Sequence, residues 1–458
     1  MSSIPEQVRL VLENTEPLRW ARDNRLPLYL WPIMDLAVDD EVKAKSIIQQ
    51  LDERGIGLIS TWNPSDRERT LTRGLQIARI QKQLGLRVNV NANLCTYSFF
   101  NGDLRTAHID GSGGAFFDSS FGEGHKMGCP FALDFRRSEM QKRVEFFVQA
   151  YYEADLEIGF IFADWEIDGP IEWNGAWAAS KCCQRCQDQI EDIGDFTTFQ
   201  SALRQKRSEL QREMLADTVT SCFPNALVGN YGVYPHDGHR YWYDYFEKFV
   251  DGTPYTQEGG AKYRQWFDEF PLTGYTFAMP VVYTWDKIWS WYDFDQVDYR
   301  WFYNMLKVGS NAGKSTSSET PIVTFVHWHT VHTTDDSNSD IQQFSENMYQ
   351  ELLWHLLLRG HDTLFMWCPL DQAAQEVRLV HQVYAASLEY KDFLELGVPI
   401  NFDVPFQPGP VISGIRLGDH LLLRRTDFDD TRTDVTLTVD GFPVEVPRIL
   451  GRCMIKSL

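Results

Sequence analysis

Two carboxylates stand two residues apart in the sequence Phe162-Ala163-Asp164-Trp165-Glu166. If the apolar residues before them form a β-strand, Asp164 and Glu166 project to one side, with Cα atoms about 6.5 to 7 Å apart. Carboxyl groups that close, in a site that excludes water, favour one ionised and one protonated member at neutral pH. Cleavage of a glycosidic bond needs such a pair, because one group protonates the leaving oxygen and the other stabilises or attacks the anomeric carbon.

Residues suited to binding a sugar follow other predicted strand ends. Aromatic rings stack on sugar faces, and carboxylate, amide and imidazole groups bind hydroxyls. An acidic residue here can equally cap a helix, and strand-end tryptophans are often core, but the pair with its neighbours favours catalysis. We therefore expect substrate contacts from Asp168, Trp31, Trp62, Asn91, Asn93, Tyr231, Tyr283, Asp286, His327, Trp367 and Asp371.

The carboxylate segment, with Trp173 after it, resembles the Asp-Trp-Glu segment of the hyaluronidase family of glycoside hydrolases. The run Tyr-Gly-Val-Tyr-Pro from residue 231 is similar to that family's tyrosine-rich strand end, and Leu-Phe-Met-Trp from residue 364 is similar to its eighth strand. The resemblance covers three short islands. It implies that Glu166 is the general acid/base, that Asp164 orients a 2-acetamido group whose oxygen is the nucleophile, and that Tyr231 or Tyr283 assists.

These residues end short β-rich segments that alternate with long amphipathic ones, the pattern of a parallel sheet wrapped by helices. The length of 458 residues suits one (β/α)8 barrel with insertions and an appendage. Active sites of such barrels lie where strands run into their following helices, so long segments at 93–129, 167–193 and 235–265 would wall a cleft. Eight strands are predicted, at 28–33, 57–61, 87–91, 159–164, 227–231, 275–281, 322–327 and 363–367.

The connecting segments carry helix signals. Acidic residues at 39–41 and 66–68 begin helices that Gly55 and Gly85 end, which places negative charge at the positive pole of each helix. Apolar residues at a spacing of three to four predict further helices at 138–156, 197–221, 341–358 and 372–396.

After residue 396 the pattern changes to proline-rich connections and alternating apolar residues. We predict a catalytic α/β domain, a (β/α)8 TIM barrel, over 1–396 and a small C-terminal all-β module over 397–458. Its strand-like segments are 398–406, 412–424 and 433–446, with Asp440-Gly441 as a hairpin turn. The role expected for this module is structural.

The chain has 64 acidic and 43 basic residues, a net charge of −21, which disfavours a nucleic-acid partner. No apolar stretch approaches the roughly 20 residues of a membrane span. The sequence as given begins without a secretory signal, so we expect a cytoplasmic location. We expect a carbohydrate substrate, no nucleic acid, no membrane and no cofactor, and leave homo-oligomer formation open.

Eight cysteines are scattered along the chain, which fits reduced thiols. Cys183-Gln-Arg-Cys186 has the spacing of a redox pair or of half a zinc site. A zinc knuckle needs a second pair, and none has matching spacing. We therefore expect ordinary loop and helix cysteines and no metal.

Other functions remain as alternatives. A glycosidase could use Asp164 or Glu166 as direct nucleophile, with an acid such as Asp286 or Asp237 from another strand. A metal-dependent hydrolase could use His327 and His329, with His332, His236 and Asp371 as further ligands, although amidohydrolase-type barrels carry such a pair on strand one. A non-catalytic carbohydrate-binding barrel is disfavoured because both carboxylates are present.

Overall fold

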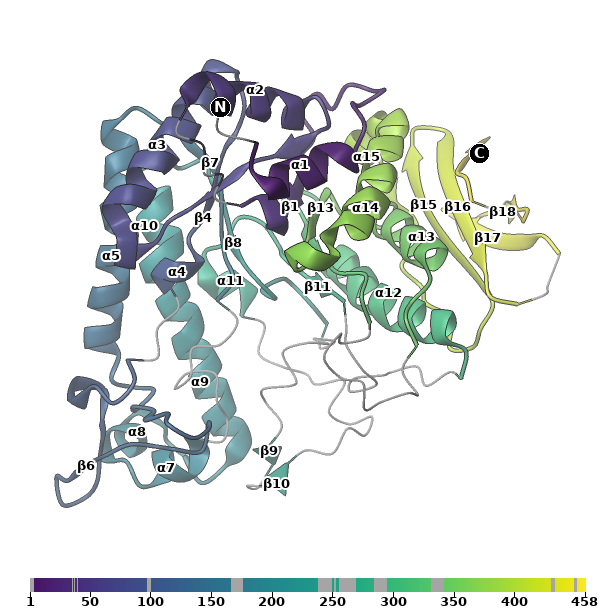
Figure 1. Ribbon diagram of the computed structural model, residues 1–458. Coiled ribbons are helices and arrows are strands. Elements are labelled where there is room, and N and C mark those ends of the chain that lie inside the picture. Colours follow the sequence, from purple (N-terminus) through teal and green to yellow (C-terminus); the bar gives the residue numbers. More distant parts are fainter. Residues whose placement is uncertain are drawn as a thin grey trace. The chain divides into compact units, whose positions relative to one another are not determined.

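The computed structural model describes residues 4–34, 36, 38, 40–96, 100–165, 176–237, 249–250, 253–254, 269–283, 295–330, 342–429, 433–448 and 451–458. The chain forms two compact units. Unit 1 comprises Met1–Leu58 and Ala278–Leu458, and unit 2 comprises Ile59–Phe277. Each unit is built on its own parallel sheet (Figure 1).

The sheet of unit 1 has five parallel strands in the order β11-β12-β13-β1-β2. Strands β12, β13 and β1 are buried throughout, as expected for parallel strands covered on both faces. The register aligns Val326 of β12 with Met366 of β13, and Leu30 of β1 with the same Met366, so these three strands end at one edge. The strands are β1 (Leu28–Leu30), β2 (Ile56–Gly57), β11 (Val281–Val282), β12 (Val323–Val326) and β13 (Thr363–Met366).

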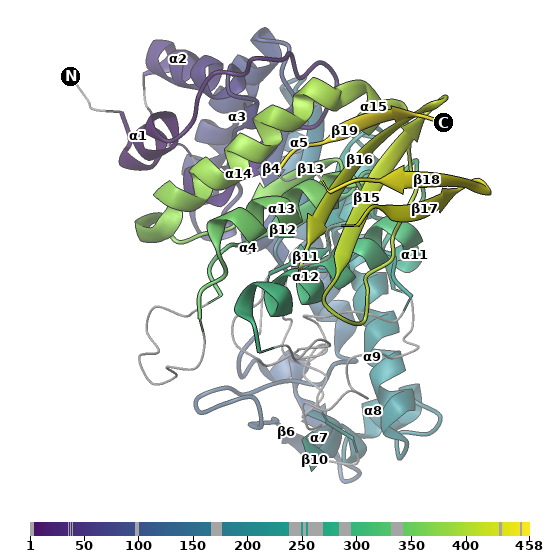
Figure 2. The same cartoon turned by 90° about the vertical axis from the view of Figure 1, so that its right-hand side faces the viewer.

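Helices of unit 1 begin at residues whose side chains accept from the first turn. Asp40 caps α2, Gln296 caps α12 and Ser345 caps α13. In Figure 2, α12, α13 and α14 lie side by side, in agreement with their mutual contacts. The main helices are α1 (Glu6–Glu13), α2 (Glu41–Asp52), α12 (Val297–Ser315), α13 (Glu346–Leu357), α14 (Ala373–Ser387) and α15 (Lys391–Leu396).

The C-terminal module of unit 1 is antiparallel and contacts α13 and α15 (Figure 1, yellow). Arg424 of β16 pairs with Glu351 of α13 through Nη2 and Oε1 at 2.5 Å, with both side chains nearly buried. This ion pair supports the expected structural role, because a buried charge requires a close partner. The strands are β14 (Val398–Pro399), β15 (Pro410–Leu417), β16 (His420–Asp427), β17 (Val435–Val439), β18 (Phe442–Val446) and β19 (Met454–Ser457).

The sheet of unit 2 has four parallel strands in the order β3-β4-β7-β8. They are β3 (Ile59–Thr61), β4 (Val88–Asn91), β7 (Ile158–Ala163) and β8 (Leu227–Asn230). The register pairs Asn91 with Phe162 and Ala163 with Asn230, so the carboxyl ends of the last three strands lie together. The residues that follow these ends are the ones that the sequence marks as functional.

The outer helices of unit 2 are α3 (Arg67–Gln83), α5 (Leu133–Glu153), α9 (Phe196–Gln211), the π-helical turn η5 (Arg212–Ala216), and α10 (Asp217–Thr220). Short helices are α4 (Asn93–Thr96) and α11 (Phe270–Thr273). Asp195 caps α9 by accepting from Thr198 N–H. Gly85, with φ +70°, ends α3 as predicted, since only glycine adopts this conformation without strain.

A small lobe of unit 2 is formed by residues 101–132 and 176–195. It contains η3 (Leu104–Thr106), β5 (His108–Ile109), β6 (Ala115–Phe116), α7 (Trp177–Lys181) and α8 (Gln184–Gln189). Figure 1 shows α7, α8 and β6 beside the beginning of α9. The segments that follow the third and fourth predicted strands therefore fold together into a lobe with its own apolar core.

The predicted α/β fold class, with parallel sheets and a C-terminal antiparallel β-module, is confirmed by the strand order in both units and by the module. The predicted strand at 57–61 is two strands, β2 and β3, separated by Leu58. The segment 412–424 is a hairpin that turns at Gly418, whose φ is +57°. The domain boundary after residue 396 stays a prediction. No helix among the described residues is long and apolar enough to cross a membrane.

Candidate active site

Asp164 lies directly after β7 in unit 2, and its half-buried side chain stands between buried Ala163 and buried Trp165. The backbone of the next residue, Trp165, is held at both its N–H and its carbonyl. Trp165 N–H donates to Oδ1 of Asn230 at 2.8 Å, and its carbonyl accepts from Nδ2 of Asn230 at 3.1 Å and from Nη2 of Arg207 at 2.8 Å. The backbone that follows Asp164 is thus clamped by two buried side chains.

The sequence did not single out Asn230 or Arg207. Arg207 is fully buried on α9, its guanidinium lies 5.7 Å from the centre of the Trp165 ring, and its Nη1 lies 3.7 Å from Oε2 of buried Glu269. Arg207 shares the buried face of α9 with polar Gln200, Arg204, Ser208 and Gln211. An arginine on the core-facing side of a predicted helix is the signal that could have identified it, because a buried charge requires fixed partners.

The predicted partner of Asp164, Glu166, lies outside the described residues, as do Asp168 and Asp286. The spacing between the two carboxyl groups therefore stays a prediction. Tyr231 is almost fully buried and follows β8 on the neighbouring strand, where its N–H donates to the carbonyl of Ala163 at 2.9 Å. The structure therefore places Asp164 and Tyr231 at adjacent strand ends.

Asn91 and Asn93 lie at the end of β4. Oδ1 of Asn91 accepts from the N–H of Asn93 at 2.9 Å, which closes the turn into α4. Oδ1 of Asn93 is buried and has no hydrogen-bond partner within the described part of the chain. A buried acceptor without a partner is unfavourable, so Asn93 is the better candidate of the two for contacting a ligand.

Trp62 was expected to contact substrate, and its environment corrects that expectation. The side chain is fully buried, and its ring stacks on Phe147 of α5 at 5.1 Å with an interplanar angle of 7°. Tyr151 of the same helix contacts it edge-on. Trp62 thus joins strand to helix in the core of unit 2, where no sugar can reach its faces.

A second group of expected residues lies at the strand ends of unit 1. His327 follows β12 and is almost fully buried, and its Nδ1 lies 2.9 Å from Oε2 of Glu376 on α14. The other oxygen, Oε1, accepts from Trp328 N–H at 2.7 Å and from the hydroxyl of Tyr349 at 3.0 Å. Glu376 fixes the orientation of the imidazole. The sequence analysis did not identify this role, although a glutamate on the apolar face of a predicted amphipathic helix is a signal that a sequence can show.

Aromatic rings surround His327. Trp367 meets it edge-on at 4.8 Å, Tyr283 meets it at 5.8 Å, and Tyr283 stacks on Trp367 at 6.1 Å. Trp31 packs edge-on against Phe325 at 6.1 Å. Trp31 and Trp367 are half-exposed, so parts of both rings are accessible, whereas Tyr283 is buried.

Of the proposed metal ligands, His327 and His329 lie side by side, with their ring centroids 5.3 Å apart. His332 lies outside the described residues, and Asp371 is exposed on η8 (Leu370–Gln372). His327, Cys368 and Glu376 do lie close enough to hold an ion. However, Glu376 already accepts from three protein donors, which accounts for its burial without a metal. Burial lowers the pKa of His329, which favours its neutral form.

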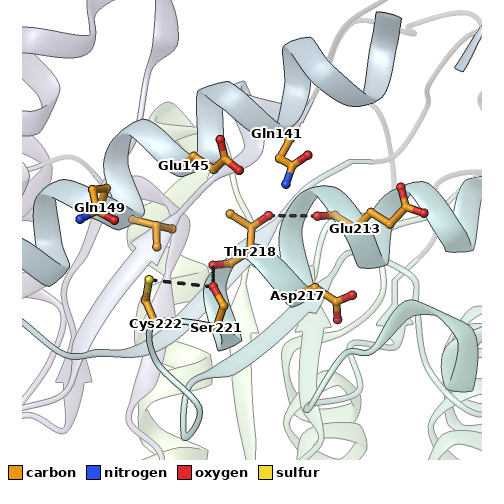
Figure 3. Close-up of a pocket in the computed structure, with 9 residues that line it drawn as sticks. Gln141, Glu145, Gln149, Glu213, Asp217, Thr218, Ser221 and Cys222 are labelled. Carbon is orange, nitrogen blue, oxygen red and sulfur yellow. Dashed lines mark hydrogen bonds between the residues drawn. The ribbon is translucent and has the colours of Figure 1, made fainter. Parts of the chain in front are cut away.

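A separate pocket of about 520 Å³ lies on the helical layer of unit 2 (Figure 3). Its lining comes from α5 and from the η5–α10 stretch and includes three carboxylates, Glu145, Glu213 and Asp217. None of the residues that line it follows the end of a strand. The pocket therefore does not include the expected site residues.

No protein-family model matches this sequence, and no curated protein matches it. Among solved structures, the chain is similar to a GH36 α-galactosidase from Geobacillus stearothermophilus in complex with stachyose (12% identity, 98% of this chain and 57% of that chain covered, TM-score 0.45). It is also similar to an α-galactosidase from Lactobacillus brevis (12%, 93% and 54%, TM-score 0.46) and to isomaltulose synthase SmuA from Protaminobacter rubrum (9%, 93% and 93%, TM-score 0.44).

The chain spans a little over half the length of these two α-galactosidases. Scores this low carry no assignment of activity or of catalytic residues. None of the three is named a hyaluronidase, so that resemblance stays a prediction.

Proposed function

We propose that this chain is a retaining glycoside hydrolase acting on an oligo- or polysaccharide. In this proposal Glu166 is the acid/base, and Asp164 orients a 2-acetamido group or acts as the nucleophile. The observation that supports it most is the clamp on the peptide after Asp164, made by Asn230 and Arg207. A catalytic carboxylate must be held within a fraction of an ångström of its working position, and this clamp restrains the backbone that follows Asp164.

The chemistry proceeds in two steps. Glu166 gives its proton to the glycosidic oxygen as the bond from that oxygen to the anomeric carbon breaks, and the acetamido oxygen or the Asp164 carboxylate bonds to that carbon. Glu166, now ionised, then takes a proton from water, whose oxygen displaces the first nucleophile. Both carboxyl groups return to their starting states, with retention of configuration.

Other features support a sugar as substrate. Trp31 and Trp367 at the strand ends of unit 1 expose part of their rings, and aromatic faces stack on sugars. The acceptor of Asn93 at the end of β4 can take a hydroxyl hydrogen. A role in polysaccharide degradation and a cytoplasmic location belong to the same proposal.

The test is hydrolysis of aryl glycosides with and without a 2-acetamido group by the wild type, Glu166→Gln and Asp164→Asn. We expect Glu166→Gln to lose at least about a hundredfold in kcat, the usual contribution of a general acid, and Asp164→Asn to lose kcat as well because the nucleophile or its orienting group is removed. Glu53→Gln, at an exposed carboxylate, is the matched control and should be fully active. Full activity of Glu166→Gln on the best substrate would contradict the proposal. If only substrates without the acetamido group were cleaved, the acetamido oxygen could not be the nucleophile.

A further inference from the structure

Three cysteines and one histidine meet in the small lobe of unit 2, outside the carboxylate segment. His108 is on β5, Cys129 precedes α5, and Cys183 and Cys186 lie at the start of α8. All four are buried, and one ligand atom from each lies within 4.8 Å of every other. The sequence lacked a second pair of cysteines at matching spacing, but the fold supplies the remaining ligands from a separate segment.

The sulfur positions match those of a tetrahedral metal site. Sγ of Cys129 lies 3.4 Å from Sγ of Cys186 and 3.8 Å from Sγ of Cys183. With Zn–S bonds of about 2.3 Å, two sulfurs of a tetrahedral zinc site lie about 3.8 Å apart. All three are free cysteines.

The imidazole of His108 gives an independent indication. Both ring nitrogens are buried, and neither has a hydrogen-bond partner of normal geometry among the described residues. Leaving a buried nitrogen without a partner costs about 1 to 3 kcal/mol. Coordination of a metal by one nitrogen removes part of this cost and explains why a histidine stands among three thiols.

Hydrogen bonds hold the ligand-bearing parts of the lobe together. Cys129 N–H donates to the carbonyl of Thr106 at 2.6 Å, and Nη1 of Arg185 donates to the carbonyl of Ala107 at 3.2 Å. Gly128 is required here, because a Cβ atom at this position would lie 2.4 Å from the Thr106 carbonyl oxygen. The backbone therefore fixes His108 beside Cys129, and α8 beside both.

The lobe also has a reason to bind a metal. Its strands β5 and β6 have two residues each, and Cys129, Cys183 and Cys186 are themselves members of its apolar core. Small lobes with little regular structure commonly depend on a metal or disulfides for stability. Four protein ligands leave no open coordination position, which is the arrangement of structural rather than catalytic zinc.

We propose that His108, Cys129, Cys183 and Cys186 bind one Zn²⁺ that holds the small lobe together. The cysteines bind as thiolates and His108 as neutral imidazole, so binding releases the thiol protons. This proposal does not depend on the glycosidase activity.

The test measures the metal content of the purified full-length protein by mass spectrometry after growth with zinc. We expect about one zinc per wild-type chain and loss of that zinc in Cys183→Ser. Cys182→Ser is the matched control, because the exposed neighbouring cysteine lies outside the cluster, and it should keep the metal. Wild type without metal, full zinc in Cys183→Ser, or iron in place of zinc would overturn the proposal.

Two further measurements apply if Cys183→Ser fails to fold. His108→Cys keeps four ligands and should retain zinc, and wild type reloaded with Co²⁺ should show the strong visible absorption of tetrahedral thiolate coordination. Weak, octahedral-type Co²⁺ absorption would overturn the proposal. So would a thiol titration of the unfolded chain, with chelator present, that finds two of the eight cysteines in a disulfide.

Discussion

Nδ1 of His327 lies 2.9 Å from Oε2 of Glu376, so a buried carboxylate on α14 orients the imidazole at the end of β12. Glu376→Gln would keep an acceptor for Trp328 and Tyr349 but place an amide NH₂ against His327. We expect the free energy of unfolding to fall by about 1 to 3 kcal/mol, the penalty of an unsatisfied buried group, and kcat/KM to fall with it. Urea unfolding and steady-state kinetics measure both, with exposed Glu389→Gln as control. Wild-type behaviour in both assays would contradict the orienting role.

Asn230 offers a test of the clamp on Trp165. Asn230→Ala removes the hydrogen bonds of Asn230 to the N–H and to the carbonyl of Trp165, whereas the hydrogen bond from Arg207 to that carbonyl remains. We expect unfolding to be easier by about 1 to 3 kcal/mol and kcat to fall more than KM rises, because Asp164 would be held less firmly. Asn225→Ala, at an exposed asparagine, is the control. Reduced stability with unchanged kcat would show that the clamp does not position the carboxylate.

Trp62 and Trp367 should respond in opposite ways. Trp62 is buried against Phe147, so Trp62→Ala should lower the free energy of unfolding by about 3 to 5 kcal/mol. Trp367 is half-exposed, so Trp367→Ala should chiefly raise KM for a sugar substrate. Chemical unfolding and Michaelis kinetics on both variants separate the two roles. A raised KM in folded Trp62→Ala, or an unchanged KM in Trp367→Ala, would reverse this assignment.

Chelation should act through the fold of unit 2. A strong chelator is expected to lower the melting temperature of the wild type and of Cys182→Ser by roughly several °C, with no further effect on Cys183→Ser. Any loss of hydrolytic activity should follow the loss of folded protein measured by near-ultraviolet circular dichroism. Activity that disappears while this signal persists would instead indicate a metal in the reaction, as in the hydrolase alternative built on His327.

Local patterns predicted most strands and helices because their signals are short-range. Asp40 before α2 and Gly85 after α3 mark helix ends directly, and the Asp440-Gly441 turn shows the positive φ of both residues. Helix α12 was not among the predicted helices, although its apolar residues recur at helical spacing, and polar Arg300, Asn304 and Asn311 are buried within it as well.

The sites were harder to predict, since they depend on contacts between distant segments. Glu376 and His327 are 49 residues apart, and Cys129 and Cys186 are 57 residues apart. No spacing rule applies to either separation, and no local pattern links Cys183 with His108. Trp62 stands at a strand end like Trp367, but which ring faces a helix depends on packing that the local pattern does not contain.

The buried His361 makes stability depend on pH. Its Nε2 lies 2.9 Å from the carbonyl of Gly309, and its Nδ1 contacts the hydroxyl of Thr324. Burial lowers the pKa of His361 from 6.5 to about 4, outweighing the opposite effect of the Gly309 carbonyl, and the charge of Arg359 adds to the lowering. Between these two values the unfolded chain binds more protons than the folded one. Stability from this group is therefore complete above about pH 6.5 and is lost as the pH falls towards 4.

This difference between the pKa values of His361 in the unfolded and folded chain lowers the free energy of unfolding by roughly 3 kcal/mol as the pH falls from about 6.5 to about 4. We expect His361→Gln to be less stable than the wild type at neutral pH but to lose less of its stability on acidification. His420→Gln, at an exposed histidine, should keep the wild-type slope. Urea unfolding of the three proteins across this pH range measures the slopes. Because burial also lowers the pKa of His355, some acid sensitivity should remain in His361→Gln, whereas an unchanged slope in that variant would show that His361 is not the group responsible.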